Sequence, residues 1–240
     1  MISRDSIEAF AKKYQTSEQN VLREYFQHLF LSSFYQQEGM KNVHFKGGTA
    51  LRLVYHSPRF SEDLDFESPL ADIHQIESAI IATLAKIQTE GIEAELDEAK
   101  ETSGGYLSTM RFLAFEKKIP IRIEISFRNR KSMGAMTIVT SDLFPDYSIT
   151  QLAEEQLLAG KIAALLDRKK PRDFYDFYFI LRHNLLPEKN KGTILRQTLE
   201  NLQSSSLRFE SELKEFLPKS HHMIIRDFKK TLTQEIKHYL

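Results

Sequence analysis

The fold is decided by two short blocks, Phe-Lys-Gly-Gly-Thr-Ala-Leu-Arg from Phe45 to Arg52 and Arg-Phe-Ser-Glu-Asp-Leu-Asp-Phe from Arg59 to Phe66. Together they predict a strand, a turn, a helix and a second strand, at Val43 to Lys46, Gly47-Gly48, Thr49 to Tyr55 and Asp63 to Glu67. Glycine lets the backbone approach a ligand closely, and the first turn of a helix offers unpaired N–H groups to an anion. The first block therefore suits a triphosphate, although an ordinary strand-to-helix turn has the same pattern.

The second block places two carboxylates on one face of its predicted strand. Asp63 and Asp65 are two residues apart, so their side chains lie about 6.5 Å apart along the strand, while Leu64 and Phe66 point into a core. Two neighbouring carboxylates repel each other unless a cation lies between them, and magnesium prefers oxygen ligands and bridges carboxylates to phosphates. We therefore predict a metal site here rather than a solvated acidic rim.

A third carboxylate lies on the predicted strand from Ile119 to Phe127. Its apolar residues alternate with polar ones, which places Glu124 on the polar face with Arg122 and Ser126. Beside the strand of Asp63, Glu124 would complete a metal-binding triad or deprotonate an attacking hydroxyl. The alternative is a polar face open to water, in which Glu124 pairs with Arg122.

The remaining pattern predicts an α+β fold in which a small mixed sheet precedes a mostly helical C-terminal domain. The first forty residues predict two helices, with Thr16 or Ser17 capping the second. Further elements are a helix at Ile73 to Thr89, strands at Ile92 to Leu96 and Tyr106 to Phe115, and helices at Gln151 to about Arg168 and Arg172 to His183. We place the domain boundary between residues 145 and 146.

The composition bears on disulfides, metal sites, membrane spans and location. The 240 residues include no cysteine, which excludes disulfides and thiolate metal sites and permits a cytoplasmic location. We expect no membrane span and no signal peptide, because long apolar runs and a basic start followed by an apolar stretch are missing. Net charge is zero, yet residues 60–101 hold 12 acidic against 2 basic side chains, and residues 102–240 hold 23 basic against 16 acidic ones.

The predicted helices around Pro171 carry a second set of charged residues beside their apolar stripes. Lys161 flanks one stripe, where a lysine usually extends to solvent. Asp173 has an ordinary interpretation as a first-turn carboxylate, and Asp176 has one as the partner of Arg172 one turn earlier. Taken alone, this segment favours a structural role.

Both sets of residues resemble the motifs of one family, the AbiEii/AbiGii toxins of the polymerase-β-like nucleotidyltransferase superfamily. The first motif is similar to Lys46-Gly47-Gly48-Thr49-Ala50-Leu51, Arg59 and Ser61 to Phe66, and the later one to Lys161 to Leu165 with Arg168, Pro171, Arg172-Asp173 and Asp176. The resemblance runs from about Phe45 to Leu181. One departure is Gly-Gly-Thr, where many superfamily members carry Gly-Ser.

The resemblance implies a role for each matching residue. The nucleotide would be held by Lys46, Gly47, Gly48, Thr49, Arg59 and Lys161. The metal ligands would be Asp63, Asp65 and Glu124, holding two magnesium ions. The catalytic set would be these three acidic residues with Lys161 and Asp176.

The resemblance also implies a biological role as the toxin of a bacterial toxin–antitoxin or abortive-infection system. The chain would transfer a nucleoside monophosphate from a nucleoside triphosphate to an acceptor, expected to be transfer RNA or another RNA, and a separately encoded antitoxin would neutralise it. Two alternatives stay open. One is a non-catalytic module that binds a nucleotide or a partner, and the other is transfer to a protein hydroxyl or a small molecule.

Overall fold

The computed structural model describes residues 2–70 and 72–240, which form two compact units. The sheet unit consists of the chain up to His56 together with Phe60–Ala153, and the helical unit consists of Ser57–Arg59 together with Glu154–Leu240. This arrangement confirms the predicted class, a mixed sheet followed by helices. Among the described residues, no helix has the length and apolar character needed to cross a membrane.

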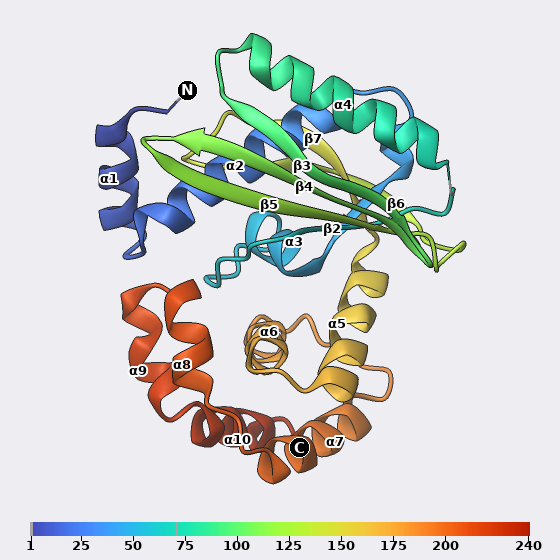
Figure 1. Ribbon diagram of the computed structural model, residues 1–240. Helices are drawn as coiled ribbons and strands as arrows, with labels where there is room; N and C mark the ends of the chain where they lie inside the picture. Colours follow the sequence, from blue (N-terminus) through green and yellow to red (C-terminus); the bar gives the residue numbers. More distant parts are fainter. Residues whose placement is uncertain (1, 71) are drawn as a thin grey trace. The chain divides into compact units, whose positions relative to one another are not determined.

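The sheet unit contains seven strands in the order β3-β4-β5-β2-β1-β7-β6 (Figure 1). The strands are β1 (His44–Lys46), β2 (Leu64–Glu67), β3 (Ala94–Thr102), β4 (Gly105–Ala114), β5 (Lys117–Ser126), β6 (Gly134–Val139) and β7 (Tyr147–Leu152). Its helices are α1 (Arg4–Lys13), α2 (Glu18–Phe34), α3 (Gly47–Leu53) and α4 (Ile73–Thr89). The sheet is mixed, because β1 pairs antiparallel with β2 whereas β2 and β5 run parallel.

One face of the central strands packs on α2, which is buried on nearly all sides. Phe66 of β2 is fully buried and contacts Phe34 of α2, and Phe112 of β4 stacks on Phe26 at a centroid distance of 4.4 Å. Ser17 caps this helix, as the sequence predicts, by accepting a hydrogen bond from the Asn20 N–H. Because strand side chains alternate, the residues between these buried ones face the other side of the sheet.

The predictions around β6 and β7 differ from the structure. Residues 147–152 form a strand that pairs with β1 and β6, so the helix predicted from Gln151 begins only at Glu154. The two units accordingly divide between Ala153 and Glu154 rather than between residues 145 and 146. In the short segment Tyr147–Leu152, Ile149 and Leu152 are three residues apart, a spacing that also suits a helix.

The helical unit consists of α5 (Glu154–Arg168), α6 (Pro171–Arg182), α7 (Lys191–Ser204), α8 (Phe209–Leu213), α9 (His222–Arg226) and α10 (Phe228–His238). Pro171 begins α6, where its missing N–H costs no hydrogen bond. Phe174 and Tyr175 of α6 are buried, and Tyr175 stacks on Phe228 of α10. These two aromatic side chains therefore serve the core of the unit.

The turn between β1 and α3 depends on Gly47. Its φ of +86° is a conformation that side-chain-bearing residues rarely adopt, and a Cβ at this position would overlap the carboxylate of Asp65. We expect Gly47→Ala to destabilise the protein by about 1–3 kcal/mol, because both the backbone and Asp65 would be strained. The measurement is the midpoint of urea denaturation.

Gly160→Ala is the matched control, since Gly160 lies within α5 and a Cβ there would meet no neighbouring atom. Alanine should stabilise this helix position by about 0.5–1 kcal/mol. An unchanged midpoint for Gly47→Ala would contradict the need for glycine in the turn.

Candidate active site

Three charged residues lie in register on neighbouring strands of the sheet unit. Lys46 of β1 is opposite Asp65 of β2, and Asp65 is opposite Glu124 of β5. Residues that are directly opposite on paired strands share a face of the sheet. The structure therefore brings together three of the residues that the sequence predicts for the site, on the face away from α2.

The two strand residues that flank Asp65 show the alternation that the sequence predicts. Leu64 and Phe66 are both fully buried, whereas Asp65 is partly exposed. Asp63, also partly exposed, lies one residue before the start of β2. Both aspartates of the predicted metal pair are thus accessible to a ligand.

The turn after β1 is tied to the start of β2. The carboxylate of Asp65 lies beside the backbone of Gly47, where no side chain would fit. Thr49, in the first turn of α3, is buried, and its hydroxyl donates a hydrogen bond to the carbonyl oxygen of Asp63. Thr49 therefore fixes the backbone from which Asp63 projects.

The ammonium group of Lys46 is held by Glu67, a residue that the sequence analysis missed. Glu67 is buried and forms an ion pair with Lys46, and it also accepts hydrogen bonds from the Ser126 hydroxyl at 3.0 Å and the Asn129 N–H at 3.1 Å. The signal for Glu67 was its spacing, since it continues the alternation of Asp63 and Asp65 along the strand. Its negative charge balances Lys46 in the polar face of the sheet.

Glu124 has two neighbours that support different interpretations. Its position opposite Asp65 suits a third ligand, yet its carboxylate accepts a hydrogen bond from Arg122 at 3.2 Å, and both side chains are about half exposed. An exposed pair of this kind contributes little to stability, so Arg122 does not hold Glu124 firmly.

The two aspartates suit a divalent cation that takes its other ligands from water and substrate, rather than a cation enclosed by protein side chains alone. Among residues 2–70 and 72–240, no three Asp, Glu or His side chains are gathered closely enough to bind a metal ion. Magnesium in phosphate-transferring sites is commonly bound by one or two carboxylates, and water and substrate phosphates supply its other ligands. The oxygen donors of Asp63 and Asp65 match that requirement.

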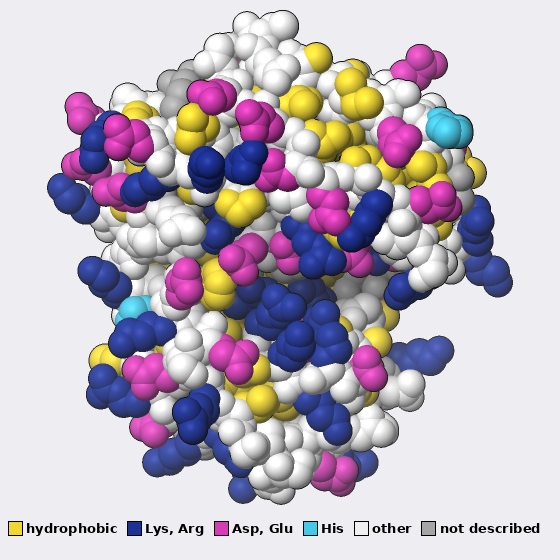
Figure 2. Space-filling view, in the orientation of Figure 1, with side chains coloured by type: hydrophobic (Ala, Val, Ile, Leu, Met, Phe, Trp, Pro, Cys, Tyr) yellow, Lys and Arg dark blue, Asp and Glu magenta, His cyan; other side chains and the backbone are white. Residues whose placement is uncertain are grey.

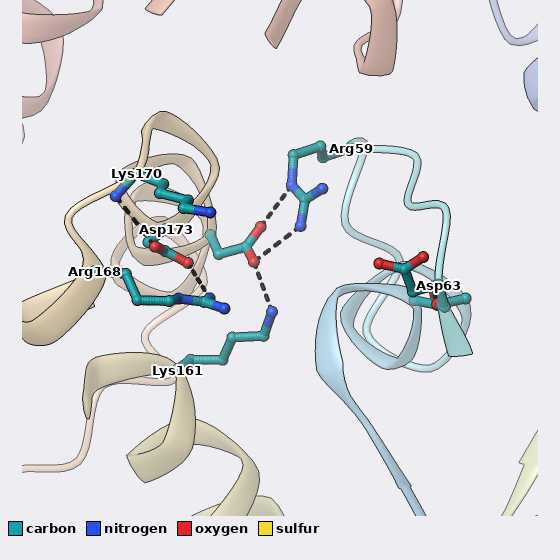
Figure 3. Close-up of polar contacts among 8 residues, drawn as sticks. Arg59, Asp63, Lys161, Arg168, Lys170 and Asp173 are labelled. Carbon is teal, nitrogen blue, oxygen red and sulfur yellow. Dashed lines mark hydrogen bonds and ion pairs between the residues drawn. The ribbon is translucent and has the colours of Figure 1, made fainter. Parts of the chain in front are cut away.

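The helical unit contains a separate buried charge cluster, centred on Asp176 (Figure 3). Arg59 donates to both carboxylate oxygens, with Nε–Oδ1 and Nη2–Oδ2 distances of 2.7 and 3.0 Å, and Lys161 Nζ donates to Oδ2 at 2.7 Å. The side chain of Asp176 is 3% exposed, and those of Arg59 and Lys161 are 6% and 13% exposed. Two cations and one carboxylate leave this cluster with a net positive charge.

The electrostatics of Asp176 follow from this pairing. Burial by itself would raise its pKa, but the charges of Arg59 and Lys161 and their hydrogen bonds outweigh burial and lower the pKa to about 2. Burial alone would lower the pKa of Arg59, but the negative charge of Asp176 outweighs this effect and raises it. Asp176 is therefore a poor proton acceptor near neutral pH and acts as an anchor for two cations.

The ordinary interpretation of Asp176 as the partner of Arg172 is wrong, because Arg59 and Lys161 occupy both of its oxygens. The corresponding interpretation of Asp173 is supported. Its carboxylate accepts a hydrogen bond from the Lys170 N–H at the start of α6 and another from Arg168 at 2.6 Å (Figure 3).

Replacing Asp176 with asparagine should destabilise the helical unit. Arg59 and Lys161 would remain buried as like charges, at a cost of about 3–5 kcal/mol at pH 7. Because the pKa of Asp176 lies near 2 when folded and is higher when unfolded, the stabilisation is present above about pH 4 and is lost as the pH falls towards 2. Urea denaturation of both proteins should therefore show a gap in unfolding free energy that narrows over this range.

Asp167→Asn in α5 is the matched control, since Asp167 is exposed, and it should change the unfolding free energy by less than about 0.5 kcal/mol. A gap between wild type and Asp176→Asn that stays constant from pH 7 to 2 would contradict the assigned ion pairing.

Comparisons with known proteins bear on the fold and on the family of the chain. No curated protein sequence matches the chain. Two solved structures are similar over 93% of the chain, each at 18% identity with a TM-score of 0.51. One is a "putative nucleotidyltransferase" of H. pylori, matched over 99% of its length, and the other is JHP933 of Helicobacter pylori, matched over 96%. At this identity they support the fold alone.

The family match is more specific. Residues 29–237 match the family described as nucleotidyl transferase AbiEii toxin of type IV toxin–antitoxin systems, a range that includes both charge clusters. The chain therefore belongs to the AbiEii nucleotidyltransferase toxin family.

Proposed function

We propose that this nucleotidyltransferase moves a nucleoside monophosphate from a nucleoside triphosphate onto an RNA acceptor, with magnesium bound by Asp63 and Asp65. The observation that carries the proposal is the register of Lys46, Asp65 and Glu124 beside the Gly47 turn. This arrangement places carboxylate oxygens next to a stretch of backbone that has no side chain to obstruct a phosphate.

Each residue of the sheet unit has a distinct part in this proposal. Asp63 and Asp65 bind the cations, and Thr49 and Gly47 hold these aspartates in place through the turn. When bound, the two magnesium ions supply activation of the acceptor hydroxyl and neutralisation of the triphosphate charge. Glu67 keeps Lys46 extended along the polar face of the sheet.

The helical unit supplies positive charge for phosphates. Arg59 and Lys161 are fixed by Asp176, so their orientation is set before a ligand arrives and little entropy is lost when a phosphate binds. Asp176 thus serves as a positioning residue for two phosphate-binding side chains. Preorganised charges of this kind account for most of the protein's contribution to phosphate transfer.

An RNA acceptor is supported by the excess of basic side chains in residues 102–240. Figure 2 shows that acidic and basic side chains lie side by side over much of the face in view. The family membership implies an antitoxin partner, and we place the system in the cytoplasm, where transfer RNA and triphosphates are available.

Asparagine at Asp63 or Asp65 should lower nucleotide transfer by about a hundredfold or more, because several kcal/mol of transition-state stabilisation depend on the bound cation. The assay incubates the protein with total cellular RNA and each labelled triphosphate, with and without a chelator, and resolves the products on a gel. We expect magnesium-dependent labelling of transfer RNA. The fold should persist, because both side chains are partly exposed.

Asp97→Asn is the control for this experiment, since Asp97 forms an ion pair with Arg111 and lies on β3, which is separated from β2 by two strands of the same sheet. Its activity should equal that of the wild type. Full activity of Asp65→Asn would refute the metal site, and label found in protein rather than RNA would refute the proposed acceptor.

The role of Glu124 is separable from that of its neighbour Arg122. If Glu124 completes the acidic set, Glu124→Gln should lower kcat by about tenfold to a thousandfold, in the range of a lost acid–base or ligand group. Arg122→Gln should leave kcat unchanged, because Arg122 contributes only an exposed ion pair. A wild-type kcat for Glu124→Gln as well as for Arg122→Gln would show that Glu124 is not needed, and the acidic set would then be Asp63 and Asp65 alone.

A further inference from the structure

The two edges of the sheet differ in how they are protected. Edge strands expose unpaired backbone groups, and proteins commonly keep other strands away from them with charged side chains. One edge strand, β3, carries such charges, at Glu95, Asp97, Glu98, Lys100 and Glu101. The strand at the opposite edge is β6 (Figure 1), which reads Gly-Ala-Met-Thr-Ile-Val and has no charged residue. Its Met136 and Ile138 are 73% and 65% exposed.

The backbone N–H and C=O groups of β6 point alternately towards β7 and towards the open edge of the sheet. The Ala153 N–H donates to the Met133 carbonyl at 2.8 Å, which sets the phase of the β6–β7 ladder. In an antiparallel ladder every second residue directs both backbone groups to the same partner. Ala135 and Thr137 therefore face β7, and the N–H and C=O groups of Gly134, Met136 and Ile138 face the open edge.

Charges of opposite sign lie at the two ends of this strand. Arg128, Arg130 and Lys131 precede it, and Asp142 and Asp146 follow it, while residues 132–141 carry no charge. An antiparallel copy of the same segment reverses this order. The basic end of one copy then lies beside the acidic end of the other, so the segment is complementary to itself under a two-fold rotation.

From these three observations we infer that two copies of the chain pair through antiparallel β6 strands, forming one continuous sheet around a two-fold axis at Met136. In this register Met136 is opposite the second copy of Met136 and Gly134 is opposite Ile138, and the basic segment before one β6 lies at the same end as the acidic segment after the other. All backbone groups that face the open edge gain partners, and the exposed apolar side chains become neighbours on one face.

The existing contacts of the flanking residues leave room for this pairing. Asp142 accepts a hydrogen bond from Lys13 at 2.6 Å, but both side chains are more than half exposed. Arg130 is exposed and donates a hydrogen bond to the backbone carbonyl of Pro69 at 3.2 Å. A second cation can therefore share the Asp142 carboxylate in the dimer.

The first test measures the oligomeric state of the full chain by sedimentation velocity over a range of protein concentrations. The wild type should be a dimer, and Met136→Lys should weaken dimerisation by tenfold or more, because it brings two like charges together at the axis. Ile81→Lys is the matched control, since Ile81 of α4 is similarly exposed, at 58%, and should leave the dimer intact.

The second test uses the absence of cysteine from the chain. In the Met136→Cys variant, the two copies of position 136 would be directly opposite each other. Their Cα atoms would be about 5.5 Å apart, a distance that allows a disulfide between the introduced thiols. With Ile138→Cys, the two copies would be about 13 Å apart along the strands and could not be joined. Mild oxidation should therefore produce a covalent dimer of the first variant only.

A wild type that is monomeric at all concentrations would overturn the inference and leave the edge to a strand of another protein. A dimer that Met136→Lys does not weaken, or cross-linking at both cysteine positions, would overturn it as well. Asp65→Asn should dimerise like the wild type, so this result is independent of the proposed transfer activity.

Discussion

The antiparallel pairing of β1 with β2 is the constraint on which the candidate site depends. It places Lys46 opposite Asp65, and the parallel pairing of β2 with β5 adds Glu124 to the same face. The opposite face is fixed by burial against α2, since a shift of one residue would move Phe66 out of the core and Asp65 into it. Burial of the apolar side chains in the core therefore fixes the register, and the register determines which polar side chains face the candidate site.

The two charge clusters use carboxylates in opposite ways. Asp63 and Asp65 are partly exposed, which suits the cation-binding role proposed for them. Asp176 is buried and accepts hydrogen bonds from Arg59 and Lys161, whose charges lower its pKa to about 2. A carboxylate held in this way stabilises the position of its partners but has little capacity to accept a proton, so Asp176 is unsuited to deprotonate the proposed acceptor.

Local patterns in the sequence predicted local structure well. Alternation identified β5 and the buried side of β2, and helical periodicity together with a glycine after its end gave α4 its observed bounds, Ile73–Thr89. The strands β6 and β7 were missed, because each is only six residues long and a segment that short can have the composition of a loop or of a helix start. Pairing across a sheet depends on residues that are distant in sequence, which periodicity does not report.

The pairing of Asp176 with Arg59 is a second long-range contact that local sequence patterns did not reveal. Arg59 lies 117 positions earlier and within the first motif, so its neighbours in sequence suggested a role beside Asp63. The nearer candidate, Arg172, is exposed instead. Ser57–Arg59 belongs to the helical unit although the residues on both sides belong to the sheet unit. A single sequence motif therefore supplies residues to both units, and the buried ion pair gives a physical reason for its spacing.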